Sequence, residues 1–494
     1  MNSLGNFSIS PKESLDFAHV SGDFNPLHLD SVAARRTRFG QTLIHGVCGS
    51  IKALDLLLKS RGTDAALASI KVKYNKPATQ GQTLEAFEQT TDGLTRLELF
   101  ADGTRCQIID LELVDVRHAN HPSGAELSAC TATADVAVDI SIADCNGLSA
   151  ALELCWDATL MGSLFPHATQ YLPAWQLSTL LASTRIVGMK CPGLHSVYAK
   201  LDLQFSTAEP DAMTTEIAQL EYRVLGSDPR IDRIELALQS AAATGTIEAF
   251  FRPPPVRQAS FEQIATLVPN GEFKQQHALV IGGSRGLGEV ISKVLAAGGA
   301  HIMMTYAAGK NDAVSVSEDI GRDRATPTVV PYDVLDGSLC SELKDFCALV
   351  THIYYLASPT IIKNDSKKWD RKLFTRYCDF YIDGLATLLE QVLQYGVGDH
   401  ALQVFIPSSV FLEQSIKGFD EYIAAKSAAE AYAKCFEKNH RNCSVLAPRL
   451  PRLYTDQTSS IKNTDEQHTL QVIIDQLRLT ANTMAATVQM FDET

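Results

Sequence analysis

FAHVSGDFNPLHLD, residues Phe17–Asp30, places a carboxylate and an imidazole on either side of a turn. Asp23 and His28 stand on the two sides of Asn25-Pro26. The proline ring fixes its own φ and disfavours helical geometry at the preceding residue, so the stretch is not one uninterrupted helix. We expect the turn to bring Asp23 and His28 toward one water molecule, where they can act as general base and general acid. An isolated Asp or His at this spacing would more simply be a capping or surface residue.

The longer pattern favours the catalytic interpretation. It is S-G-D-x-N-P-x-H-x-D, followed by Phe39-Gly40-Gln41-Thr42-Leu43-Ile44-His45-Gly46. This pattern resembles the MaoC-like (R)-specific enoyl-CoA hydratases and dehydratases. The resemblance implies a hot-dog fold, in which an antiparallel sheet wraps a long helix.

The same resemblance implies roles for individual residues. Asp23 and His28 would hold and activate the water, and Asn25 would help to orient it. A helix is expected from Val47 to about Lys59, starting at a turn that contains Gly46. Backbone N–H groups at a helix start are unpaired, so the one at Gly46 would suit a thioester oxygen that gains negative charge.

Composition limits the possible function classes. A chain of 494 residues suggests roughly three domains. No apolar run approaches the roughly 20 residues of a bilayer span, so membrane insertion is not expected. The first residues lack a secretory pattern, and eleven cysteines without a C-x-x-C pair predict reduced thiols in a cytoplasmic protein, with neither disulfides nor a metal site. The formal net charge of −14 argues against a nucleic-acid partner.

The first half of the chain repeats one order of elements, a helix followed by a meander of strands. Strands are expected at 69–74, 84–87, 94–100 and 106–113, then a connector at 120–145, helices at 150–164 and 174–187, and strands at 197–205, 215–225, 231–239 and 244–251. We therefore predict an α+β double hot-dog region with a motif-bearing domain at 1–125 and a second domain at 126–252 that lacks the motif. The second domain would supply a wall of the acyl tunnel. His195, in a segment that resembles part of paired hydratase modules, is more simply a structural residue.

Three consecutive prolines open a linker at 253–270, and a third domain is expected at 271–494. An apolar strand, His277–Ile281, runs into a glycine-rich turn and a helix, an order that lets backbone amides approach a pyrophosphate. The spacing Gly282-x-x-x-Gly286-x-Gly288 resembles the short-chain dehydrogenase/reductase family, especially the β-ketoacyl-carrier-protein reductases. The resemblance implies an α/β Rossmann-type doubly wound parallel sheet. The residues that it places at the cofactor are Gly282, Ser284, Arg285, Gly286, Leu287, Gly288, Asp333 and Lys426.

Catalytic residues of that family have counterparts further along the chain. Tyr422 and Lys426 form a Y-x-x-x-K pair on one face of an expected helix. By resemblance, Lys426 would lower the pKa of Tyr422 and hold the nicotinamide ribose, while Tyr422 would protonate the substrate carbonyl. Ser409 would anchor the substrate oxygen.

The cofactor is expected to be NADPH. Thr305-Tyr306 stand where an acid would bind the ribose of NAD, and Arg285 is placed to meet a 2′-phosphate. Three residues depart from the family pattern, namely Ile281 before the first glycine, Ser358 in Leu356-Ala357-Ser358, and Asp383 in the expected place of the relay asparagine. Because of these departures, it stays open whether the reductase activity is reduced or absent.

Together the motifs predict a bifunctional enzyme that acts on acyl-CoA or acyl-carrier-protein thioesters. One half would hydrate 2-enoyl thioesters or dehydrate 3-hydroxyacyl thioesters, and the other would reduce 3-oxoacyl thioesters with NADPH. In the alternative, only the hydratase is active and the reductase-like domain is a scaffold or oligomerisation module. A predominantly oxidative direction is disfavoured by Arg285. A homo-oligomer is expected by resemblance, and the sequence leaves acyl length, carrier and net direction open.

Overall fold

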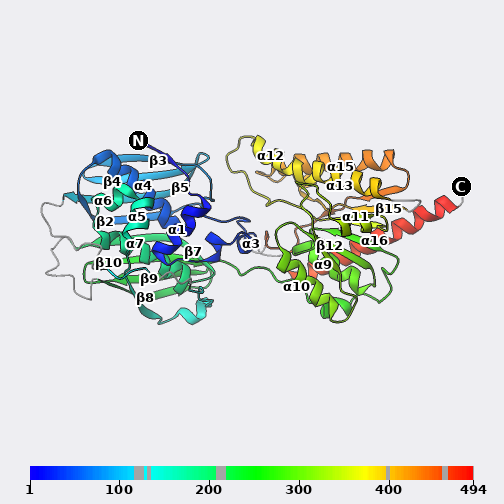
Figure 1. Cartoon of the computed structure of the whole chain (residues 1–494), viewed down its shortest axis with the longest axis horizontal. Helices are drawn as coiled ribbons and strands as arrows, with labels where there is room; N and C mark the ends of the chain where they lie inside the picture. Colours follow the sequence, from blue (N-terminus) through cyan, green and yellow to red (C-terminus); the bar gives the residue numbers. More distant parts are fainter. Residues whose placement is uncertain (116–126, 131–134, 207–217, 397–400, 459–464, 493–494) are drawn as a thin grey trace. The chain divides into compact units, whose positions relative to one another are not determined.

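The computed structural model describes residues 1–115, 127–130, 135–206, 218–396, 401–458 and 465–492 (Figure 1). It consists of two compact units, Met1–Pro254 and Pro255–Thr494, and each is described by itself. Parts of the expected connector, 120–126 and 131–134, and the start of one expected strand, 215–217, lie outside the described residues. Among the described helices, none has both the length and the hydropathy that a bilayer span requires.

The first unit is built on one antiparallel sheet of ten strands in the order β1-β3-β4-β5-β2-β7-β10-β9-β8-β6. Its middle is the antiparallel pairing of β2 with β7, in which Ser69 lies opposite Gln204. Outward from this pair the two halves follow matching orders, β2-β5-β4-β3-β1 and β7-β10-β9-β8-β6. The strands are β1 Asn2–Phe7, β2 Ala65–Tyr74, β3 Leu84–Thr91, β4 Leu94–Ala101, β5 Thr104–Asp115, β6 Ser149–Glu153, β7 Ser196–Phe205, β8 Gln219–Asp228, β9 Arg233–Gln239 and β10 Ala243–Phe251.

Each half of the sheet contributes a buried helix to one shared core. These helices are α4 (Gly46–Arg61) and α7 (Ala174–Arg185), and they contact each other. Gln176 on α7 bonds both the backbone N–H and the carbonyl of Leu67 on β2, each at 2.9 Å. The two predicted domains therefore lie in one compact unit, and the boundary between them stays a prediction.

Shorter helices complete the first unit. They are α1 Pro11–Ser21, α2 Pro26–Leu29, α3 Ser31–Ala34, the 3₁₀ turn η2 Ile142–Cys145, α5 Ala158–Leu164, α6 Pro166–Tyr171 and the π-helical turn η3 Ile186–Lys190. The helix expected at 150–164 was partly wrong, because its first residues form the edge strand β6 and only the last turns are helical. Alanine-rich sequence favours a helix, but pairing of Ala150 and Ala151 with β8 overrides that preference.

The second unit contains a six-stranded sheet in the order β13-β12-β11-β14-β15-β17, with every pair parallel. This is the strand order of a doubly wound nucleotide-binding fold. Along β11, Ala278 and Val280 face one hydrophobic cluster while Leu279 and Ile281 face another, so both sides of the sheet are covered. The strands are β11 His277–Ile281, β12 His301–Tyr306, β13 Thr328–Pro331, β14 His352–Tyr355, β15 Leu402–Phe405 and β17 Cys443–Leu446, with a separate pair β16 Ser408–Ser409 and β18 Arg449–Leu450.

Helices pack on both faces of this sheet. They are α8 Phe261–Ala265, α9 Gly286–Ala297, α10 Lys310–Gly321, α11 Ser341–Cys347, α12 Arg371–Cys378, the π-helical turn η4 Asp379–Asp383, α13 Gly384–Tyr395, α14 Phe411–Gln414, α15 Asp420–Asn439 and α16 Glu466–Asp492. The predicted parallel sheet of the third domain is confirmed.

Candidate active sites

The turn between Asp23 and His28 forms as the sequence predicts. Helix α1 ends at Ser21, and Gly22 takes the left-handed conformation with φ of 72°. Asn25 then caps α2, and its side-chain oxygen accepts a hydrogen bond of 3.0 Å from the N–H of Leu27. Asp23 thus lies in the loop between two helices, and His28 lies on the second of them.

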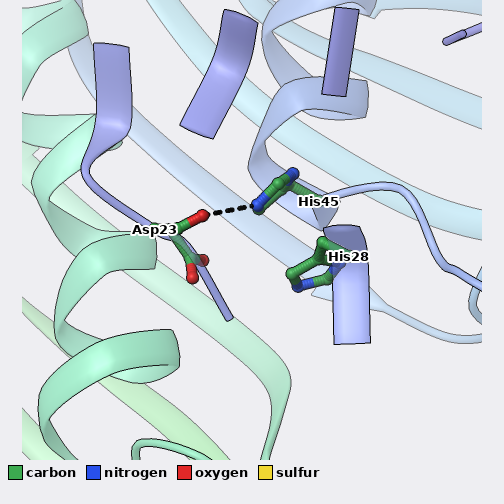
Figure 2. Close-up of side chains that lie close together, drawn as sticks. All are labelled: Asp23, His28 and His45. Carbon is green, nitrogen blue, oxygen red and sulfur yellow. Dashed lines mark hydrogen bonds between the residues drawn. The ribbon is translucent and has the colours of Figure 1, made fainter. Parts of the chain in front are cut away.

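Asp23 and His28 meet with a third residue, His45, in the first unit (Figure 2). A carboxylate oxygen of Asp23 and one ring nitrogen of each histidine all lie within 4.8 Å of one another. Asp23 and His45 are each only 1% exposed, whereas His28 is half-buried. Since a hydrogen bond is roughly 2.8 Å long, one water molecule can bridge two such groups.

His45 was not predicted as a site residue, although the turn that contains it was. Its Nε2 lies 2.9 Å from the backbone carbonyl oxygen of Asp23, and because a carbonyl only accepts, Nε2 carries the proton. Burial lowers the pKa of His45 well below its usual range, so the ring is neutral. It stacks on His28 with ring centroids 3.9 Å apart and supports the position of that imidazole.

The tautomer of His28 follows from its own hydrogen bond. Nδ1 lies 3.1 Å from the carbonyl oxygen of Leu43, so Nδ1 carries the proton and Nε2 keeps a lone pair. Burial lowers the pKa of His28, the positive charge of Arg252 lowers it further, and Asp23 opposes both effects. A neutral imidazole with a free Nε2 is a proton acceptor.

The second half of the unit completes the surroundings of Asp23. Thr184 on α7 donates a hydrogen bond of 2.7 Å to one carboxylate oxygen, and the N–H of Asn25 donates one of 3.2 Å to the other. Gly188 on η3 packs so closely that a side chain there would overlap the carboxylate. Burial nevertheless raises the pKa of the Asp23 carboxyl, against the opposing effects of His28 and Thr184. A carboxyl with a raised pKa beside an imidazole with a lowered one forms a pair suited to exchanging a proton.

The side-chain amide of Asn25 is bonded to the backbone, and its expected role in orienting the water stays a prediction. Its side-chain amide donates to three backbone carbonyls of the second half, those of Gly188, Gly193 and Leu194, at 2.8, 3.2 and 3.3 Å. Both ends of the amide are therefore engaged with the backbone. The structure gives Asn25 the role of holding the Asp23 loop against the second half.

Gly46 starts α4, where the sequence predicts an oxyanion-binding N–H. A Cβ atom at this position would lie 2.8 Å from the Tyr74 ring, so the close packing requires glycine. Contact of its N–H with a thioester stays a prediction. By distance alone, Asp23, His28 and His45 could also coordinate a cation, but two of their polar atoms, His28 Nδ1 and His45 Nε2, already donate to carbonyls.

The second unit contains the glycine-rich turn between β11 and α9. Gly282 and Gly286 have left-handed φ angles of 82° and 56°, and a side chain at Gly288 would overlap the carbonyl oxygen of Gly282. Thr305, at the end of β12, accepts a hydrogen bond of 3.1 Å from the N–H of Gly282. Thr305 thus stabilises the turn, and only glycines allow the backbone to pack this way.

Arg285 does not stand free in the turn. Its guanidinium forms an ion pair of 3.0 Å with Asp456, which is buried. Ser284 is buried in the same turn and Leu287 is partly buried at the start of α9. Asp333 is exposed after β13, and its carboxylate accepts a hydrogen bond of 3.0 Å from the N–H of Leu335.

Tyr422 and Lys426 are both buried on α15, and Ser409 lies on β16. Burial raises the pKa of Tyr422 to about 12, and the nearby Ser409 hydroxyl opposes that effect. The expected lowering of that pKa by Lys426 is wrong, because the ammonium of Lys426 points elsewhere. It donates to the carbonyl oxygen of Pro407 at 2.8 Å and lies 3.8 Å from the ring centroid of Tyr381. Burial lowers the pKa of Lys426 to about 7.

Tyr381, rather than Asp383, is the residue that meets Lys426. Both lie on η4, but Asp383 is exposed while Tyr381 is buried. The hydroxyl of Tyr381 hydrogen bonds with that of Ser358 at 2.7 Å. Ser358, one of the residues that depart from the family pattern, is therefore bonded to the residue that contacts Lys426.

Comparisons with known proteins find two families in the chain. The family described as MaoC like domain matches residues 5–98, and the family described as short chain dehydrogenase matches residues 276–464. A fatty acyl-CoA reductase of Acinetobacter baylyi is 26% identical over 196 residues, which are 38% of this chain and 66% of that protein. A peroxisomal multifunctional enzyme type 2 of Mus musculus is 37% identical over 68 residues, which are 13% of this chain and 9% of that protein. The chain spans less than two thirds of the length of either relative.

A weak structural likeness accompanies these matches. A short chain dehydrogenase from Burkholderia cenocepacia, solved in complex with NADP, has a TM-score of 0.37 at 17% identity and covers 42% of this chain and 90% of its own. From the two family matches and the two units, we conclude that this chain carries a MaoC-like domain at its N-terminal end and a short-chain dehydrogenase domain at its C-terminal end.

Proposed function

We propose that the first unit catalyses the (R)-specific hydration of trans-2-enoyl thioesters and the reverse dehydration of 3-hydroxyacyl thioesters. The observation that carries this proposal is that the buried Asp23 and the half-buried His28 lie within the reach of one water molecule. In hydration, this pair takes a proton from water as the oxygen adds to C3, and a proton returns to C2. The carrier of the acyl group is coenzyme A or an acyl carrier protein.

The matching strand orders support a double hot dog in which the halves have unequal roles. The first half supplies Asp23 and His28, while the second supplies Thr184 and Gly188 beside the carboxylate. A second half without its own acid–base pair therefore still has a function, since it packs against the carboxylate and donates a hydrogen bond to it.

For the second unit we propose the NADPH-dependent reduction of 3-oxoacyl thioesters. The glycine turn fits the pyrophosphate of a dinucleotide, because Gly282, Gly286 and Gly288 allow its close approach. The bound cofactor would supply the hydride. Ser409, on β16, and Tyr422, on α15, carry the hydroxyl groups suited to hold the substrate oxygen and give it a proton.

Specific contacts also favour the alternative of a scaffold. The Lys426 ammonium is engaged by Pro407 and Tyr381, and Arg285 is paired with Asp456. These contacts occupy two groups that the proposed cofactor would use. Titration of the full chain with NADPH distinguishes a reductase from a scaffold, because a scaffold would not bind NADPH.

The test of the proposed function uses crotonyl and acetoacetyl thioesters on both carriers, with and without NADPH. Asp23→Asn and His28→Ala are expected to abolish hydration while NADPH oxidation continues. Tyr422→Phe is expected to give the reverse pattern and serves as the matched control. Hydration that survives in both first-unit variants would show that the water-activating site lies elsewhere.

A further inference from the structure

Arg252 brings a positive charge close to the proposed hydratase site. Its side chain donates a hydrogen bond of 2.7 Å to the carbonyl oxygen of Leu194, and its backbone N–H donates one of 2.7 Å to that of His195. Asn25, which holds the Asp23 loop, bonds the same oxygen of Leu194 at 3.3 Å. One carbonyl oxygen therefore separates the guanidinium from the catalytic loop.

Among the described residues, no carboxylate forms an ion pair with Arg252. Its Nε is buried without a hydrogen-bond partner. Asp139 lies in this region, but its carboxylate is exposed and lies 3.5 Å from Nε2 of His195. The Nδ1 of His195 is also buried without a partner. A half-buried guanidinium without a counter-charge is costly in free energy, and an anion that accepts its hydrogen bonds would offset that cost.

The charge also acts on the two histidines near it. It lowers the pKa of His28 and that of His195, and burial lowers the pKa of Arg252 itself to about 10. A positive charge is not needed to bond the carbonyl oxygen of Leu194, because a neutral amide could donate the same hydrogen bond. Its position is better explained by an anionic group that arrives with the substrate.

We propose that Arg252 binds an anionic group of the thioester substrate, either a carboxylate on the acyl chain or a phosphate of the carrier, and that the unpaired Nδ1 of His195 faces the same ligand. This inference rests on the proposed hydratase function. It makes Arg252 a determinant of substrate specificity for that site.

The test compares three enoyl thioesters on the full chain. Crotonyl-coenzyme A carries phosphates, the N-acetylcysteamine monothioester of fumaric acid carries a carboxylate, and crotonyl-N-acetylcysteamine carries neither. Arg252→Gln is expected to lower kcat/KM for one of the anionic substrates about tenfold relative to the neutral one. A change common to all three, such as an effect on His28, cancels in this ratio. The substrate that responds identifies the source of the anion.

Two further variants sharpen the test. Arg252→Lys keeps the charge and should recover part of the ratio. Arg230→Gln removes an exposed arginine of the same unit, paired with Asp228, and should leave all rates unchanged. Equal ratios in Arg252→Gln and the wild type would overturn the inference while leaving the hydratase proposal intact.

A failure of the hydratase proposal can be distinguished from a failure of the inference about Arg252. If the wild-type chain hydrates none of the three substrates, the hydratase proposal fails, and calorimetric titration with coenzyme A and with fumarate then tests Arg252. Binding that is lost in Arg252→Gln would support the inference. The absence of binding to the wild type would overturn it.

Discussion

Thr184 donates a hydrogen bond of 2.7 Å to the carboxylate of Asp23, although 161 residues separate the two in the chain. The acid of the proposed site comes from one half of the sheet, and the group that stabilises its charge comes from the other. In the proposed mechanism the second half therefore contributes through the helix α7, without an acid–base pair of its own.

Replacing Thr184 by valine keeps the shape and removes the donor. Since the lost hydrogen bond favours the charged carboxylate, the pKa of Asp23 should rise further, and hydration at neutral pH should fall about tenfold. The acidic limb of the pH–rate profile should move to higher pH. Thr184→Ser retains the hydroxyl and should keep the wild-type profile; an unmoved profile in Thr184→Val would contradict the assigned role.

Gly188→Ala tests the close packing of the second half on Asp23. The added methyl would overlap the carboxylate, so Asp23 must move away from His28. Hydration should fall by about a hundredfold or more, because general acid–base catalysis depends on the position of the proton-transferring groups. The matched control is Gly162→Ala on α5, where a Cβ meets nothing within 4 Å. Equal rates in the two variants would mean that Asp23 tolerates displacement.

The sequence was sufficient for the parts of the site that lie close together along the chain. Asn25-Pro26 forces the turn between Asp23 and His28, and the structure has this turn. The glycines of the second unit likewise predicted the strand–turn–helix that forms there. In both places the local backbone chemistry decides the conformation.

Contacts between distant residues could not be predicted in this way. Thr184 and Gly188 have no local pattern that points to Asp23, and they meet it only because α7 and η3 pack beside the loop that carries Asp23. Tyr381 replaces Asp383 beside Lys426 because η4 is a π-helical turn, which changes the face that each side chain occupies. A local signal was also missed, because Ser10 and Glu13 form a capping box at the start of α1 and no helix was predicted there.

The raised pKa of Asp23 predicts that the site reduces stability. Between its ordinary pKa of 3.8 and the raised value in the folded protein, the folded state binds more protons, so stability falls as pH rises through that window. Asp23→Asn should therefore unfold at a higher temperature than the wild type at neutral pH, and the difference should shrink as pH falls toward 3.8. Hydration should fall about a thousandfold in the same variant.

Asp228 provides a control of the opposite sign. Its hydrogen bonds with Arg230 lower its pKa to about 2, so the folded state favours the charged form. Asp228→Asn should give no rise in melting temperature at neutral pH. A melting temperature of Asp23→Asn that is equal to or below that of the wild type would show that the buried carboxylate is not destabilising.

Tyr381 is expected to limit cofactor binding in the second unit. Its ring lies 3.8 Å from the ammonium of Lys426, and an attraction of this kind is worth up to about 2 kcal/mol at a desolvated site. Lys426 must give up that contact before it can bond a ribose hydroxyl. Tyr381→Asn should therefore bind NADPH about tenfold more tightly, measured by fluorescence titration. Tyr381→Phe loses only the hydrogen bond to Ser358 and keeps the ring over Lys426, so its affinity should match the wild type. If both variants bind NADPH as the wild type does, the ring of Tyr381 does not compete for Lys426, and the prediction fails.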